Sequence, residues 1–380
     1  MSSWGINLHL SIGKFVPSPA PGYITEALQA VTVTRSAEGT SGFQMNFHAD
    51  REKGLSQDYK LLSSPLLKTF NRVLLTVSVK GTPYILMDGF ITHQELVHDK
   101  DSGAATLTVT GEDVSVAMDI YEYSLEYPQV GDAAIAAIVL GKYAVVGIIP
   151  EIMPTPSGMI PITLEPDRYP QQNGTDRCYL QDLASAHGYI FYVKPGPEAL
   201  MNTAYWGPPL HIGATQKALT VDMGSATNVQ RIDFKYDARA PQLVHGMVQD
   251  DVTEIDLPLA TFAGTRFPYL AADQAVLVNQ PYVKNMQFTD PRLGYLRAAD
   301  MAQSQTNVSL DKVVTVEGEL DTLRYGSVLD APGLVPVRGV GYTYDGTYYV
   351  QQVVHQLTRG SYKQQFTLTR EGTGSLISEV

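Results

Sequence analysis

The sequence predicts a mainly β chain, a β-rich α+β fold with two related antiparallel β-barrels and small helix-containing insertions. Three observations support this class. Short segments rich in β-branched and aromatic residues dominate both ends of the chain, separated by Gly, Pro, Asn and Asp. Helix signals are few and lie in the middle. One pattern of strands and turns occurs twice within the 380 residues.

The strand segments carry the composition and the bounding turn residues expected of antiparallel sheets. Those of the first half cover 31–35, 73–79, 84–93 and 105–111. Those of the second half cover 228–236, 312–320, 347–357 and 362–370. The chain is too long for one ordinary hydrophobic core, so we expect roughly two to four units.

Two helices are predicted near the middle of the chain. The first covers 132–140 and places three apolar residues on one side: Ile135, Ile138 and Val139. The second covers 176–187 and groups Tyr179, Leu180, Leu183 and Ala184. For this second helix, Asp176 is the expected N-cap and Gly188 the expected terminator.

A third helix is expected to begin at Asp290 and Pro291, because proline favours the first helical position. Leu293 and Leu296 are expected to face inward. All three helices mark material inserted between the β units.

The most informative pattern is an internal duplication. Each copy has a strand, a Gly turn, an aromatic residue, an Asp-Gly turn, a long strand, and then a Thr-rich strand. The first copy contains Val77, Val79, Gly81, Tyr84, Asp88, Gly89, Phe90 and Ile91, followed by 106–112. The second contains Val335, Val337, Gly339, Tyr342, Asp345, Gly346, Tyr348 and Tyr349, followed by 366–371. Asp-Gly hairpins recur by chance in β proteins, but the shared spacing favours two meanders that each can close into a small barrel.

Composition and charge exclude several classes of function. Charged residues make up 17% of the chain, below the roughly 25% of soluble domains, which fits both an assembly subunit and an ordinary β-rich domain. The net charge of -12 and the lack of a basic run argue against nucleic-acid binding, sequence-specific or otherwise. A single cysteine, Cys178, excludes an intrachain disulfide and a zinc site built on several thiolates.

No targeting or membrane segment is predicted. Residues 1–21 lack the basic segment and apolar core of a signal peptide. The most apolar stretch, 133–149, contains Gly141 and Lys142 and is shorter than the roughly 20 residues that a helix needs to cross a bilayer. We therefore expect a short buried helix followed by a strand, and no transmembrane segment.

No catalytic, cofactor-binding or metal-binding residue is predicted. The chain lacks a Gly-x-Ser-x-Gly elbow, a phosphate-binding P-loop and a His-Glu-x-x-His segment. His93 and His98 lack the spacing of a metal pair. Gly339 and Gly341 precede a strand, so they indicate a turn and not a phosphate cradle. The adjacent carboxylates at 250–251 would suit a glycosidase only if they flanked a cleft.

Two stretches carry a resemblance to a known family. The first is Leu323 to Gly326, Gly333, Val335, Val337, Gly339, Tyr344 to Val350, and His355 to Arg370. The second is Tyr179 to Ala184 followed by Gly188 to Val193, with Tyr179 where the family's helix more usually has Phe. Both resemble the hub domain of phage late control gene D proteins and VgrG proteins. Together with the duplicated turn, the structural motif residues are Asp88, Gly89, Leu180, Leu183, Ala184, Gly188, Gly339, Asp345, Gly346 and His355.

The resemblance implies a structural baseplate hub of a contractile phage tail or phage-tail-like injection system, without enzymatic activity. In that family the hub is a homotrimer of tube-like barrels between the hexameric inner tube and the trimeric spike. Three chains with two barrels each would present six. The implied partners are the inner tube protein, baseplate wedge proteins, and a tape measure protein or cargo in the lumen. The sequence ends at Val380 without a fused spike, so a separate spike protein is expected.

The family's architecture implies the domain limits. The first tube-like barrel would cover 1–116 and an α+β insertion domain 117–225. The second barrel would be discontinuous, at 226–250 and 310–372, with a helix-containing insertion at 251–309 and a tail at 373–380. The protein would be made in the bacterial cytoplasm and incorporated into the virion or injection particle.

Four tyrosines near the second Asp-Gly turn are candidates for a subunit interface, since tyrosine buries ring area while its hydroxyl finds a partner. They are Tyr342, Tyr344, Tyr348 and Tyr349. Two other functions remain open. A tail-associated cell-wall hydrolase would need paired carboxylates in a cleft, and a receptor- or glycan-binding β module would need an exposed aromatic platform.

Overall fold

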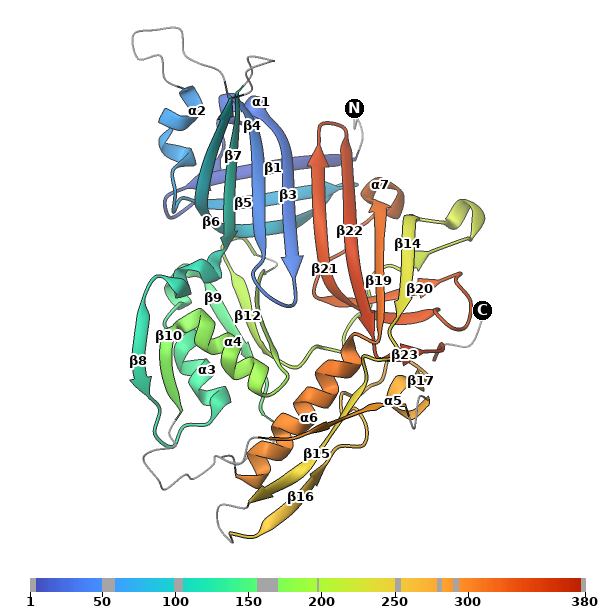
Figure 1. Cartoon of the computed structure of the whole chain (residues 1–380). Coiled ribbons are helices and arrows are strands. Elements are labelled where there is room, and N and C mark those ends of the chain that lie inside the picture. Colours follow the sequence, from blue (N-terminus) through green and yellow to red (C-terminus); the bar gives the residue numbers. More distant parts are fainter. Residues whose placement is uncertain are drawn as a thin grey trace.

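The computed structural model of the chain describes residues 5–49, 59–98, 105–155, 170–196, 198–249, 254–278, 282–289 and 294–376. Two β-rich units stand side by side in Figure 1, blue to teal and orange to red, with helix-containing material below them. Strands make up 48% and helices 21% of the structure, which confirms the predicted mainly β class.

The first unit is built from six main strands that pair in the order β1-β5-β6-β7-β4-β3. Alternation along each strand sets its faces: Val31 and Val33 are buried, whereas Thr32 and Thr34 face outward. Short elements cover one end of this unit: β2 (Ser18–Pro19), α1 (Gly22–Ala27), α2 (Lys60–Ser63) and η1 (Pro65–Leu67). The strands are β1 (Ile6–Gly13), β3 (Leu28–Ser36), β4 (Gly42–Ala49), β5 (Arg72–Val79), β6 (Thr82–His98) and β7 (Ala105–Asp113).

The second unit repeats this order as β13-β20-β21-β22-β19-β14. The pairing of its first two strands is parallel, whereas β1 and β5 are antiparallel. The strands are β13 (Leu219–Thr220), β14 (Val229–Tyr236), β19 (Val314–Asp321), β20 (Gly333–Arg338), β21 (Gly346–Thr358) and β22 (Ser361–Arg370).

β-Bulges fix which residues of the two units are equivalent. A bulge lies at Gln29 of β3 and another at Gln230 of β14, each at the same point of its pairing with the next strand. A second pair lies at Thr92 of β6 and Gln351 of β21. Bulges that recur at the same place are inherited features of a strand and not random irregularities.

The bulges also correct the predicted alignment of the two copies. Asp88 and Gly89 do not form a turn, because they lie inside β6, opposite Leu74 and Val73 of β5. The first hairpin turn is at Lys80 and Gly81 instead, both with positive φ. Asp345 does lie in the loop that precedes β21.

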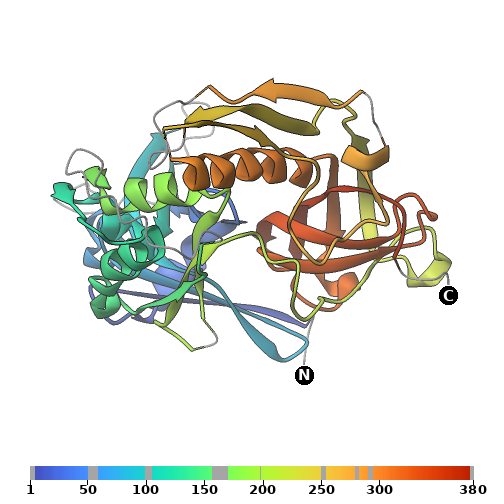
Figure 2. The ribbon, with the colours of Figure 1, turned by 90° about the horizontal axis from the view of Figure 1, so that it is seen from below.

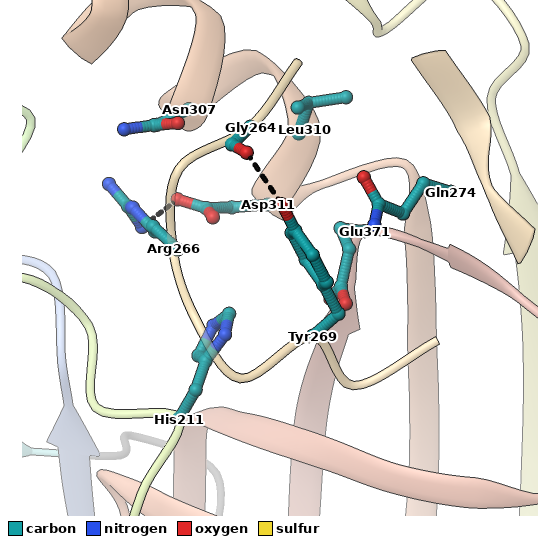
Figure 3. A pocket seen from close by; sticks show the side chains of 9 residues that line it. All are labelled: His211, Gly264, Arg266, Tyr269, Gln274, Asn307, Leu310, Asp311 and Glu371. Carbon is teal, nitrogen blue, oxygen red and sulfur yellow. Dashed lines mark hydrogen bonds and ion pairs between the residues drawn. The ribbon is translucent and has the colours of Figure 1, made fainter. Parts of the chain in front are cut away.

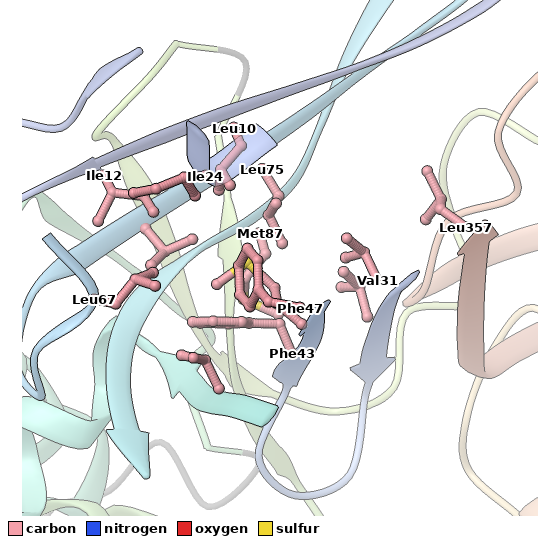
Figure 4. Close-up of a cluster of buried hydrophobic side chains, with 14 of the residues drawn as sticks. Leu10, Ile12, Ile24, Val31, Phe43, Phe47, Leu67, Leu75, Met87 and Leu357 are labelled. Carbon is pink, nitrogen blue, oxygen red and sulfur yellow. The ribbon is translucent and has the colours of Figure 1, made fainter. Parts of the chain in front are cut away.

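One strand pairing joins the two units. β21 runs antiparallel to β3, from Gln352 opposite Ser36 to Thr358 opposite Ala30. We call this pairing the seam. It makes both units parts of one 13-stranded sheet. Figure 4 shows Leu357 of β21 beside Val31 of β3, where it contributes to the core of the first unit.

The first insertion has its own core under a three-stranded sheet, β11-β12-β9. The predicted helix 132–140 and the strand after it are confirmed as α3 and β9, but Ile138 is 52% exposed and does not face the core. The N-cap of α4 is Thr175 and not Asp176, whereas Gly188 follows the helix at φ +62° as expected. The elements are η2 (Val114–Asp119), β8 (Glu122–Glu126), α3 (Asp132–Gly141), η3 (Ala144–Val146), β9 (Ile148–Ile152), β10 (Gln171–Thr175), α4 (Asp176–Ala186), β11 (Ile190–Pro195) and β12 (Asn202–Gly207).

The second insertion is built around α6, which Figure 2 shows beside the sheet of β15, β16 and β18. The predicted start of this helix, at 290–293, lies outside the described residues. Within the described residues the helix begins at Tyr295. Leu296 is 61% exposed, so its predicted inward orientation is wrong. Its elements are β15 (Gln242–Gln249), β16 (Asp256–Ala260), β17 (Asp273–Gln274), α5 (Ala275–Val278), β18 (Lys284–Gln287) and α6 (Tyr295–Asp311). Outside the insertion lie η5 (Gly224–Ala226), α7 (Thr322–Tyr325) and β23 (Gly372–Thr373), of which β23 pairs with β17.

No helix in the described ranges combines the length and the apolar character that crossing a bilayer requires. The predicted domain limits stay predictions.

Candidate functional site

The outward face of the 13-stranded sheet is a polar surface that extends over both units. In the first unit its side chains are mainly small and uncharged: Thr32, Thr34, Gln44, Asn46, Thr106, Thr108 and Thr110. In the second unit it carries charges that pair with one another. The pairs are Arg231–Asp233 at 2.6 Å, Lys235–Glu317 at 2.7 Å and Lys363–Glu319 at 2.6 Å.

This face has an open hollow of about 380 Å³ in the second unit. Arg231, Glu317 and Gln365 are among the side chains that line it. The two charges of each pair neutralise one another, and an exposed pair of this kind contributes about 0–1 kcal/mol to the free energy of unfolding. The charges on this part of the face therefore largely balance one another.

Asp88 anchors the first insertion to the sheet. Both of its carboxylate oxygens accept from Arg72, from Nε and from an Nη atom, each at 2.7 Å. Asn202 at the start of β12 donates to the same carboxylate at 2.9 Å. All three side chains are buried. The structure thus explains why an Asp stands here inside a strand, a role that the Asp-Gly pattern did not indicate.

Gly89, next to Asp88, lies where β6 approaches β7 too closely for a side chain. A Cβ at this position would lie 2.0 Å from the carbonyl oxygen of Glu112 on β7. That approach has no room for a side chain, so β6 and β7 come together at Gly89 only because the residue lacks one.

Asp345 is the last residue of the loop before β21, which begins at Gly346, and Arg370 holds this loop in place. The guanidinium of Arg370 donates to the carbonyl oxygens of Thr343, Asp345 and Gly372, at 2.9–3.0 Å. It also stacks over the Tyr348 ring at 4.3 Å. Burial lowers the pKa of Arg370 from its ordinary value. Arg370 was part of the sequence resemblance, but only the tertiary contacts reveal its function in the loop.

Gly339 begins this loop at φ +90°, which favours glycine. Its position also leaves no space, because a Cβ would lie 1.9 Å from the carbonyl oxygen of Val221.

His355 is a core residue on β21. It is fully buried, and its Nδ1 contacts the Tyr362 hydroxyl at 2.9 Å and the Gln364 side-chain amide at 3.1 Å. Burial, aided by the charge of Arg35, lowers the pKa of His355 to about 3. The imidazole is therefore neutral at physiological pH and has a packing role in the seam.

The predicted residues of α4 form the core of the first insertion. Leu180, Leu183 and Ala184 are buried, and the Leu180 carbonyl oxygen accepts from the Trp206 indole at 3.1 Å. The Gly188 carbonyl oxygen accepts from Arg266 of the second insertion at 2.6 Å. The end of α4 is thus a joint between the two insertions.

The four tyrosines divide into two pairs. Tyr348 is 0% exposed and Tyr349 is 6% exposed within a single chain, so neither can supply a subunit contact and the prediction for these two is wrong. Tyr342 is 53% exposed and Tyr344 is half-buried, and their interface role stays a prediction.

His187 is a second joint that sequence reasoning missed. At the end of α4, its Nε2 contacts Asp132 of α3 at 2.8 Å, and its Nδ1 contacts Asp300 of α6 at 2.5 Å. Burial alone would lower its pKa, but the hydrogen bonds to the two carboxylates outweigh this and raise the pKa to about 9. These three residues lie far apart in the sequence, so no local pattern could have brought them together.

The cavity in Figure 3 lies where the second insertion meets the second unit. It has a volume of only about 10 Å³, enough for about one water molecule. An ion pair between Arg266 and Asp311 closes one side, and Tyr269 donates to the Gly264 carbonyl oxygen at 2.9 Å. The cavity is therefore part of a structural junction.

The described residues contain no group of three or more His, Cys, Asp or Glu side chains placed to hold a metal ion. The carboxylate pair at 250–251 lies outside the described residues.

Comparison by sequence finds no matching family model and no matching curated protein. Comparison by fold finds several solved structures. A 43 kDa tail protein of prophage MuSo2 from Shewanella oneidensis has a TM-score of 0.64 and 13% identity, over 96% of this chain and 98% of its own. A tail protein from Neisseria meningitidis has a TM-score of 0.63 and 13% identity, over 98% of both chains.

A third similar structure is an Escherichia coli component of the type VI secretion system. Its TM-score is 0.53 with 11% identity, over 90% of this chain and 73% of its own. The chain therefore has a fold that is also found in phage tail and type VI secretion proteins, over nearly its whole length.

Asp88→Ala is expected to destabilise the protein by about 3–5 kcal/mol, because it leaves the Arg72 charge buried without its partner. The free energy of unfolding in urea measures this. The matched control is Glu38→Gln, which breaks the exposed Lys312–Glu38 pair and should cost less than about 1 kcal/mol. Equal effects of the two substitutions would contradict the anchoring role of Asp88.

His187→Gln is expected to destabilise the protein in a pH-dependent manner. The folded-state pKa of about 9 lies above the ordinary 6.5, so the charged imidazole stabilises the fold fully below pH 6.5. This contribution is lost as the pH rises through 9. The difference in free energy of unfolding between wild type and variant should therefore shrink between pH 6.5 and pH 9.

The control for this measurement is His9→Gln, at an exposed position on β1. A wild-type advantage over His187→Gln that stays constant across the same pH range would argue against a charged His187.

Proposed function

We propose that this chain is a structural baseplate hub subunit of a contractile phage tail or phage-tail-like injection system. As a homotrimer, it joins the hexameric inner tube to the trimeric spike. It acts mechanically and not as an enzyme, and it is incorporated into the virion or injection particle.

One observation carries the proposal: the same strand order occurs twice in one chain, and the seam joins both copies into one sheet. A chain with two equivalent units converts threefold symmetry into a pseudo-sixfold face, because three chains present six units. A hexameric tube and a trimeric spike differ by this same factor of two. The whole-length similarity to phage tail proteins supports the same setting.

The outward face of the sheet suits the lumen of such a hub. Its uncharged Thr, Gln and Asn side chains, and its mutually neutralised ion pairs, offer no strong attraction to a polymer that passes through. A tape measure protein or cargo would then slide without being retained. The ends of the two units would contact the inner tube, the separate spike protein and baseplate wedge proteins.

The purified chain is expected to sediment as a trimer, at three times the mass of one chain, and to bind a separate spike protein at one trimer per spike. Analytical ultracentrifugation with and without the spike measures both. A strict monomer that never joins the spike would refute the hub.

The chain is expected to release no fragments from purified peptidoglycan, because the two carboxylates that meet at His187, those of Asp132 and Asp300, are already held by its imidazole. Turbidity of cell-wall suspensions, with lysozyme as the positive control, measures this. Wall clearance that survives removal of contaminating hydrolases would favour the cell-wall hydrolase instead.

A further inference from the structure

One edge of β14, and the last part of one edge of β6, pair with no other strand among the described residues. In the described ranges, His93–His98 of β6 pairs only with β7, because β5 reaches no further than Phe90 and the backbone groups of Ile91 bond to Phe70 and Asn71. Likewise β14 pairs only with β19. An edge strand presents a row of free N–H and C=O groups, so it is a template for another strand.

The seam shows how these two edges fit together. The bulges make His93–His98 of β6 equivalent to the part of β21 that pairs in the seam. They also make β14 equivalent to β3, the other strand of the seam. Each chain therefore forms this joint once internally. It keeps the two equivalent halves of a second joint apart, one on β14 at the end of the sheet and one on the part of β6 that extends beyond β5.

We propose that copies of this chain associate by antiparallel pairing of β14 of one copy with the His93–His98 segment of β6 in the next, in the register of the seam. The inference rests on the homotrimer of the proposed function and deepens it, because it names the strands that join the copies.

The seam register predicts individual pairs. Because His355 faces Val33 within the chain, Leu96 should face Phe234 between chains. By the same rule, Glu95 should lie opposite Lys235, and Val97 opposite Asp233. The inward pair is apolar on both sides, and the first outward pair has opposite charges. Both kinds of cross-strand pair are stabilising.

The inward side chains on the two free edges are less buried than their equivalents in the seam. Val31 and Val33 of β3, covered by the seam, are 1% and 0% exposed. Their equivalents on β14, Ile232 and Phe234, are only half-buried although they point into the same kind of core. Leu96 is also half-buried. A second copy would bury these side chains as the seam buries theirs.

Lys235 already pairs with Glu317 of its own chain, at 2.7 Å, and both side chains are more than half exposed. In the proposed joint Lys235 would lie between Glu317 and Glu95 of the next copy. The joint thus adds an opposite charge to one side of an exposed lysine without leaving any charge buried and unpaired.

Disulfide trapping tests the strands and their register. In a Cys178→Ser background, Val97→Cys and Asp233→Cys together place cysteines on directly opposite outward positions, where Cβ atoms approach within roughly 5 Å. Mild oxidation of the full-length protein should convert most of the monomer band on non-reducing gels into crosslinked oligomers.

Two matched controls accompany this variant. Thr32→Cys with Gln356→Cys places cysteines at the equivalent pair of the seam, so it should form an intrachain disulfide. Val97→Cys with Phe234→Cys shifts the register by one residue, which points the two side chains to opposite faces, so it should not crosslink.

The outcomes separate this inference from the proposed function. A trimer by mass that fails to crosslink, while the seam control does, would overturn the β6–β14 joint and leave the trimeric hub standing. Efficient crosslinking into open chains that grow beyond three copies would support the joint and count against a closed trimer. A monomer without crosslinks would overturn both.

Discussion

The pairing of β21 with β3 is the interaction on which the rest of the structure depends. It places Leu357 and Tyr362 of the second unit in the core of the first, so the first unit does not complete its interior alone. Each strand pair in the seam also satisfies backbone groups that would otherwise form an open edge. The two insertions are then held at fixed positions below a single continuous sheet.

Buried polar contacts fix the insertions to that sheet. The Arg72–Asp88 pair and Asn202 hold the first insertion, and His187 links it to the second through Asp132 and Asp300. Buried charges cost desolvation energy, which close partners offset, so such groups specify one arrangement more than they add stability. These residues position elements of the fold relative to one another.

The duplication was visible in the sequence, but its alignment was not. Asp-Gly is the strongest short signal for a hairpin, and it is misleading at Asp88, where the carboxylate serves an ion pair inside a strand. Only the bulges at Gln29, Gln230, Thr92 and Gln351 establish the true equivalence. A bulge is a property of two paired strands, so one strand's sequence cannot reveal it.

The sequence by itself determined the mainly β class, the repeated meander and the helix 176–187 with its end at Gly188, because these follow from composition and spacing between near neighbours. The tertiary structure alone decided that Tyr348 is core, that His187 bridges two insertions and that β21 joins β3. Those facts depend on which distant segments meet. Strand alternation fixes the faces of a strand but leaves its partner and register open.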